Sequence, residues 1–218
     1  LFPRCLAGHM APAMTVLYRL DAAAAAIAAR FGAVAGHDPW AGGTIAPGRF
    51  APVLTMGREF IAGPGRADQP LRMIPRLWGV PPPPNAGDPV RGVLTVRNPG
   101  SPFWIGNLRN SEFRCLVPAT ALMVWGRVDP ATGRRRQHWL ACPGQPVFAM
   151  AGVWKDSEVP SFALLTTEAN ALWRGLGHDA MPAILPGDGG AWRTWLRADW
   201  KRAAELLAPY PSSQMAQT

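Results

Sequence analysis

Proline and glycine interrupt this chain so often that we expect short helices and short strands. The 218 residues include 24 prolines and 23 glycines, and the apolar residues fall into short runs between them. Proline removes a backbone donor and glycine weakens a regular element, so each run predicts one short element. The apolar patterns predict strands at 15–20, 52–58, 60–62, 73–79, 93–97, 114–125, 138–142, 147–154 and 161–166. They predict helices or helical turns at 21–32, 102–109, 168–175, 189–198 and 200–208.

This order of elements predicts an α+β fold with a mainly antiparallel, barrel-like sheet and flanking helices. Asp21 is expected to cap the alanine-rich first helix. Residues 14–208 fit the size of a single domain. Residues 1–13 show no periodicity and precede Met14, so we expect a leader, a tag or a misassigned start. Residues 209–218 are expected to be a polar tail.

The composition excludes several classes of protein. No apolar run approaches 18 residues, so we expect no membrane partner. The three cysteines, Cys5, Cys115 and Cys142, form no C-x-x-C pair, which argues against a disulfide framework and a zinc site. We therefore expect a cytoplasmic protein with neither a metal nor another cofactor, and a monomer.

The net charge is +8, carried by 20 arginines and only 2 lysines. Residues 58–136 hold 12 arginines against five acidic residues, a net +7. GC-rich coding explains a preference for arginine over lysine, but it does not explain why acidic residues are scarce in one segment. Because the guanidinium fork matches phosphate, this segment indicates a polyanionic partner.

Eight short motifs follow one another along most of the chain. They are MTVLYRL at Met14, TIAPG at Thr44, RLWGVP at Arg76, TVRN at Thr95, RCLVPATAL at Arg114, AGVW at Ala151, LTTEAN at Leu165 and HDAMPAIL at His178. Their order and spacing resemble the SRAP family (SOS-response-associated peptidase), proteins that shield abasic sites in single-stranded DNA. The resemblance covers roughly residues 14–207 and implies single-stranded or abasic DNA as the partner.

In that family, a cysteine exposed by removal of the initiator methionine attacks the aldehyde of an abasic sugar. The resemblance places this nucleophile at Thr15 and the assisting glutamate at Val124, so neither the thiol nor the carboxylate is present. The assisting imidazole matches His178, and the phosphate-binding arginine matches Arg97, with Thr95 in place of the family asparagine. We therefore treat His178 and Thr15 as the catalytic candidates.

The same resemblance suggests further DNA contacts at Asn98, at Pro47 and at Trp78. Each candidate also has an ordinary structural interpretation. His178 beside an aspartate is also typical of a hydrogen-bonded turn, and Arg97 of a solvated surface. Trp78 is expected either to stack on a base or to belong to the core.

The leading hypothesis is a DNA-damage-response protein that binds single-stranded or abasic DNA and has lost the thiol-dependent crosslink. One alternative is an active abasic-site-processing enzyme that uses the N-terminal amine of Thr15, and another is an autoproteolytic peptidase. A third is a non-catalytic protein-interaction module. The family implies an enzyme, but the nucleophile and the glutamate are both replaced here, and a threonine hydroxyl is not ionised near pH 7. The sequence therefore leaves both an enzyme and a binding protein as hypotheses.

Overall fold

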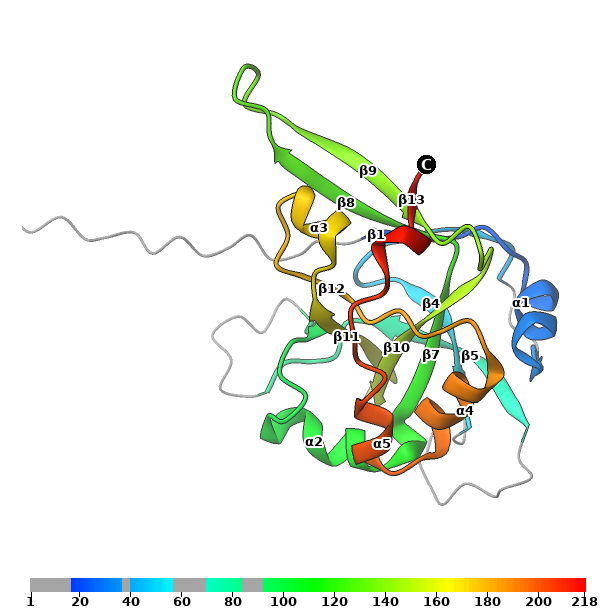
Figure 1. Cartoon of the computed structure of the whole chain (residues 1–218). Coiled ribbons are helices and arrows are strands. Elements are labelled where there is room, and N and C mark those ends of the chain that lie inside the picture. Colours follow the sequence, from blue (N-terminus) through cyan, green and yellow to red (C-terminus); the bar gives the residue numbers. More distant parts are fainter. Residues whose placement is uncertain (1–16, 37–39, 57–69, 84–91) are drawn as a thin grey trace, which may run out of the picture.

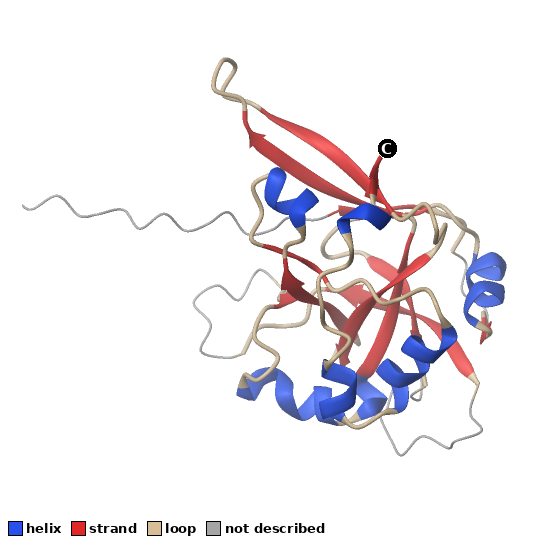
Figure 2. Ribbon diagram, in the orientation of Figure 1, coloured by secondary structure: helices blue, strands red, loops and turns tan. Residues whose placement is uncertain are grey.

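The computed structural model describes residues 17–36, 40–56, 70–83 and 92–218, and it contains two sheets with helices around them (Figure 1). The first sheet has five antiparallel strands. In spatial order they are β13 (Ala216–Gln217), β9 (Arg135–Ala141), β8 (Ala121–Val128), β1 (Leu17–Leu20) and β3 (Gly43–Ile45). Strands β8 and β9 form a long hairpin that projects from the body, as Figure 2 shows.

The second sheet forms a ring. Its spatial order is β12 (Ala180–Pro182), β11 (Ser161–Glu168), β10 (Phe148–Lys155), β7 (Arg114–Ala119), β4 (Phe50–Thr55), β5 (Leu71–Trp78) and β2 (Ala33–Val34), with β6 (Thr95–Val96) beside β11. Strand β11 also pairs in parallel with β5, which closes β11, β10, β7, β4 and β5 on one another. The predicted α+β fold with a mainly antiparallel, barrel-like sheet is confirmed.

Helices lie around the sheets, and α2, α4 and α5 gather at the end opposite the β8–β9 hairpin (Figure 1). The helices are α1 (Ala24–Phe31), α2 (Pro102–Arg109), α3 (Ala171–Gly175), α4 (Gly189–Arg197) and α5 (Trp200–Ala204), with 3₁₀ turns at Ser111–Phe113 and Ser212–Gln214. The prediction that Asp21 caps the first helix is wrong, because the N-cap residue is Ala23. The backbone N–H of Ala24 donates instead to the carbonyl of Trp40 at 3.0 Å.

The predicted strand at 114–125 is two strands in two different sheets. Strand β7 pairs with β10 and β4, whereas β8 pairs with β1 and β9. The chain changes sheets at Thr120, whose N–H donates to the carbonyl of Arg19 and whose hydroxyl accepts from the N–H of Asp21. The predicted strands at 52–58 and 60–62 lie partly outside the described residues, and the described part of the first overlaps β4, which pairs with β5.

The expectation of a polar tail at 209–218 needs correction, because these residues bind back onto the body as a C-terminal strap. Strand β13 pairs with β9, and the N–H of Thr218 donates to the carbonyl of Trp139 at 2.9 Å. Tyr210 and Met215 are buried. Both are held by Asn170, whose Nδ2 donates to the Tyr210 carbonyl at 2.7 Å and contacts the Met215 Sδ at 3.3 Å. These partners are distant in sequence, so the local polarity of the segment did not indicate them.

Candidate nucleic-acid interface

Two residues that the sequence singled out, Arg97 and His178, line one cleft of about 590 Å³. The cleft lies where the β8–β9 hairpin meets the end of β6 and the turn between α3 and β12. Its charged and aromatic lining consists of Arg97, Trp125, Arg127, Arg135, His178 and Asp179. Three cations therefore face one carboxylate, which gives the cleft a net positive charge.

His178 is held with a defined ring orientation. Its backbone N–H donates to the carbonyl of Trp173 at 3.1 Å, and its ring meets the Trp173 indole edge-on with centroids 5.8 Å apart. The ring Nε2 lies 2.7 Å from the carbonyl oxygen of Trp125. Because a carbonyl only accepts, Nε2 carries the proton and donates, so in the neutral ring Nδ1 is the nitrogen that can accept a proton.

The helix that carries this turn is fixed at both ends. At its start, the Asn170 side chain caps α3 by accepting from the N–H of Trp173 at 3.0 Å. At its end, the Arg127 guanidinium donates to the carbonyls of Arg174 and Gly175, each at 3.2 Å. Gly177 has φ +94°, and a Cβ there would lie 3.0 Å from the Arg127 side chain, so the turn requires glycine to approach the hairpin.

Arg97 directly follows β6, which is held against β11. The hydroxyl of Thr166 donates to the Val96 carbonyl at 3.0 Å, which fixes the backbone next to the guanidinium. Arg97 Nη1 lies 3.6 Å from Asp179 Oδ2, but both side chains are at least half exposed, at 50% and 76%. An exposed pair of this kind is worth little, so the guanidinium stays available to an anion.

The other predicted DNA contacts are not brought together in this cleft. Thr95 pairs with Leu164 inside the sheet, and the Asn98 side chain accepts from the N–H of Gly100 within a turn. Pro47 lies between β3 and β4 and is not part of the cleft lining. Thr15 lies outside the described residues.

Trp78 belongs to the core, which corrects the prediction that it offers a face to a base. Its side chain is 1% exposed, and its Nε1 donates to the carbonyl of Leu94 at 3.1 Å. Its ring meets Tyr18 edge-on at 5.2 Å and stacks near Phe162 at 6.4 Å. A base could not reach this ring without opening the barrel.

Trp125, and not Trp78, is the tryptophan that lines the cleft. It is half-buried, stands in β8 opposite Gln137, and forms one wall of the cleft. The β8–β9 pairing shifts register between Trp125 and Val128, as a β-bulge does, and bulges re-aim side chains. This wall lies within the arginine-rich segment 58–136 that the sequence pointed to.

Val124, where the resemblance implies a glutamate, is 1% exposed and packs with the core. The first described residue of β1, Leu17, pairs with Met123, the residue before Val124. The chain thus enters the fold close to the cleft, but the side chain at 124 can neither give nor take a proton.

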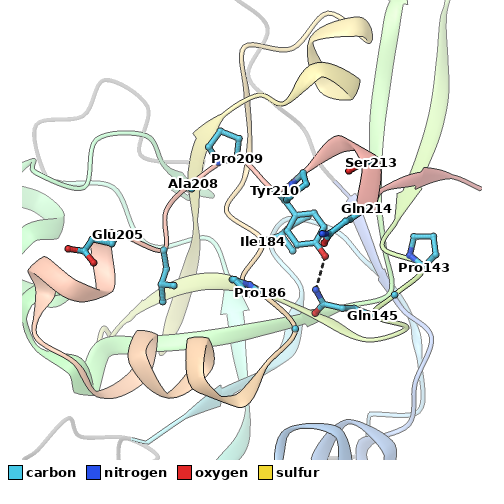
Figure 3. A pocket seen from close by; sticks show the side chains of 14 residues that line it. Pro143, Gln145, Ile184, Pro186, Glu205, Ala208, Pro209, Tyr210, Ser213 and Gln214 are labelled. Atoms are coloured by element: carbon cyan, nitrogen blue, oxygen red, sulfur yellow. Dashed lines mark hydrogen bonds between the residues drawn. The ribbon is translucent and has the colours of Figure 1, made fainter.

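A larger cavity of about 670 Å³ lies under the C-terminal strap (Figure 3). Its walls are mostly apolar, with Ile184, Pro186 and Pro209 among them. The Gln145 Nε2 donates to the Tyr210 hydroxyl at 2.8 Å, and burial raises the pKa of that tyrosine. This lining contains no lysine, arginine or histidine, so the smaller cleft is the better site for a polyanion.

Two other classes of site receive no support from the part of the chain that the structure describes. No three His, Cys, Asp or Glu side chains within those ranges lie together as a metal would require. No helix there is long and apolar enough to cross a membrane.

Comparison with known proteins places the chain in a family. Abasic site processing protein YoqW of Bacillus subtilis (strain 168), and the protein of the same name from Bacillus phage SPbeta, are each 29% identical over 111 residues. The similarity covers 47% of this chain and 47% of each relative, so it spans about half the length of these proteins.

Solved structures share the fold. A protein from Bacteroides thetaiotaomicron has a TM-score of 0.72 at 20% identity, with 92% of this chain and 90% of that chain covered. A phage-related protein from Bordetella bronchiseptica has a TM-score of 0.66 at 18% identity, with 93% and 92% covered. The model of the family SOS response associated peptidase (SRAP) matches residues 14–218. The chain therefore belongs to the SRAP family.

Proposed function

We propose that this protein acts in the response to DNA damage by binding single-stranded or abasic DNA, and that it has lost the thiol-dependent crosslink. The observation that carries the proposal is the cleft in which Arg97 and His178 meet beside Trp125. The relatives named for abasic-site processing support DNA as the partner.

The cleft offers each kind of contact that a damaged strand requires. Arg97, Arg127 and Arg135 supply guanidinium groups for phosphates. The exposed part of Trp125 supplies a face for an unpaired base. His178 presents Nδ1 as an acceptor for a sugar hydroxyl, or as a base for a proton of the opened sugar. With three phosphate contacts on a single strand, the slope of log K against log salt should be about −2.

Covalent capture is not expected from the 218-residue chain. Thr15 has no thiol, and its nitrogen is a peptide nitrogen in this chain rather than an amine. Val124 removes the carboxylate that would move a proton. Two buried, unpaired cysteines among the described residues support a reducing cytoplasm, which we propose as the compartment of a monomer.

The test is fluorescence anisotropy with a labelled five-nucleotide strand, intact or with a central abasic site. Arg97→Ala should weaken binding by about 1–3 kcal/mol, because a charge-assisted contact is lost. Arg193→Ala, which removes the same charge from an exposed position on α4, is the matched control and should change little. A denaturing gel of the abasic complex should show no adduct.

Two outcomes would contradict the proposal. Equal losses for Arg97→Ala and Arg193→Ala would mean that only the net charge attracts DNA. A heat-stable adduct from the unchanged chain would mean that another nucleophile does the work that we consider lost.

A further inference from the structure

The tip of the β8–β9 hairpin extends beyond the body (Figure 1). Every side chain from 127 to 136 is exposed except that of Asp129, which is half-buried. The turn is nevertheless ordered: the N–H of Gly133 donates to the Asp129 carbonyl at 2.8 Å, and the N–H of Asp129 donates to the Arg134 carbonyl at 2.8 Å. We call residues 127–136 the arm. A two-stranded hairpin without an apolar face gains little from burial, so core packing does not explain its length.

The arm concentrates positive charge without compensation. Arg134, Arg135 and Arg136 are consecutive, and within the described ranges no carboxylate forms an ion pair with any of them. The one acidic residue of the arm, Asp129, uses its Oδ1 to accept from the N–H of Ala131 at 2.9 Å. Three adjacent guanidinium groups repel one another unless an anion lies between them.

The arm continues the surface of the cleft. Arg135 lines the cleft, and it also lines a second, open hollow on Trp125 together with Arg134. A strand that leaves the cleft past Trp125 therefore meets Arg134 next. The arm runs out and back over ten residues, so each leg spans at most about 17 Å at about 3.3 Å a residue. That length matches about five nucleotides of stacked DNA at about 3.4 Å each.

From this placement we propose that the arm binds the phosphate backbone of the same DNA, beyond the nucleotides held in the cleft. The inference rests on the proposed function, and it adds a second set of contacts that lengthens the footprint. Phosphodiesters fit better than an acidic peptide, because consecutive guanidinium forks match a row of evenly spaced phosphates.

The experiment compares a five-nucleotide and a 15-nucleotide strand, each by anisotropy across a salt series. The variant is Arg134→Ser/Arg136→Ser, which leaves the cleft residues in place. The 15-nucleotide strand should bind this variant about tenfold more weakly at low salt. The slope of log K against log salt should flatten by about 1.4, which is about 0.7 for each lost phosphate contact. The shorter strand should bind it as it binds the wild type.

Two control variants distinguish binding at the arm from attraction by the net charge of the protein. Arg109→Ser/Arg202→Ser removes the same charge from exposed positions on α2 and α5, at the opposite end of the molecule (Figure 1), and should leave both strands bound as in the wild type. Arg134→Lys/Arg136→Lys should keep most of the salt slope. Unchanged melting temperatures are expected for all three double variants, because the replaced side chains are exposed.

Each failure has its own pattern. If the longer strand binds the arm variant as well as the wild type, the arm is not a DNA contact, although the cleft can still be one. If the α2–α5 variant loses as much affinity as the arm variant, net charge alone explains the effect and the arm proposal is wrong. If poly-glutamate competes as well as the 15-nucleotide strand, the partner is an acidic polymer of another kind. If the wild type binds neither strand, the proposed function itself fails.

Discussion

Replacing Trp78 with alanine tests whether this tryptophan belongs to the core or to the DNA-binding surface. If it belongs to the core, the substitution lowers stability and leaves DNA binding intact. Trp78 is 1% exposed, contacts the rings of Tyr18 and Phe162, and donates to the Leu94 carbonyl. Truncating a buried tryptophan to alanine costs about 3–5 kcal/mol of unfolding free energy. The loss of a donor to a carbonyl adds about 1 kcal/mol.

At about 2–4 °C per kcal/mol for a chain of this size, the melting temperature should fall by roughly 10–20 °C. Below the new transition, the variant should still bind the five-nucleotide strand, since the cleft residues are unchanged. Trp125→Ala is the matched variant: it removes the same side chain from the cleft wall but keeps the carbonyl that holds His178. It should lose about 1–3 kcal/mol of DNA binding, with a much smaller change in melting temperature.

Circular dichroism gives the melting temperatures, and anisotropy at 15 °C gives the affinities. The reasoning is refuted if the pattern is reversed, with Trp78→Ala folded as stably as the wild type but unable to bind DNA. A Trp125→Ala protein that binds normally would remove the stacking contact from the proposed function and leave only phosphate contacts.

Three further predictions concern the strap, the thiols and the missing chemistry. Asn170→Ala should lower the unfolding free energy by about 2–3 kcal/mol, from the helix cap and the bonds to the strap, as measured in urea, and hydrogen exchange at 212–217 should accelerate. Burial raises the pKa of the Cys142 thiol to about 12 and that of the Cys115 thiol further. Both thiols should therefore react with iodoacetamide at pH 8 far more slowly in the native protein than in urea. Peptide mapping by mass spectrometry measures the difference. Thr15→Cys with Val124→Glu, in a chain that begins one residue before position 15, should form a heat-stable adduct with abasic DNA, and more of it than Thr15→Cys alone. Because position 124 is buried, the new carboxylate should also lower the stability of the protein. A folded double variant without an adduct would show that this pocket no longer supports the chemistry.

The sequence predicted the elements well where the pattern was local. Apolar runs between prolines and glycines indicated most of the strands, and the spacing of tryptophan and leucine indicated α4. The resemblance to the family selected Arg97 and His178, which the structure brings into one cleft. The sequence also indicated the arginine-rich segment 58–136, which contains the arm, because charge is read directly from the residues.

What the sequence could not decide was which surfaces meet. Trp78 and Trp125 both stand in strands of eight residues, and only the pairing of those strands places one inside the barrel and the other on the cleft wall. The closure of the ring by β5 and β11 joins residues more than 80 positions apart.

Residues 209–218 show the same difference between what their local composition indicates and what their distant contacts decide. Their composition is polar, but Tyr210 and Met215 are buried because Asn170, some 40 residues earlier in the chain, binds both. Local propensity depends on the few residues around a position, and it determined the kinds of elements. Burial depends on partners that are distant in the chain, so only the tertiary structure decided which tryptophan faces the cleft and where the strap is held.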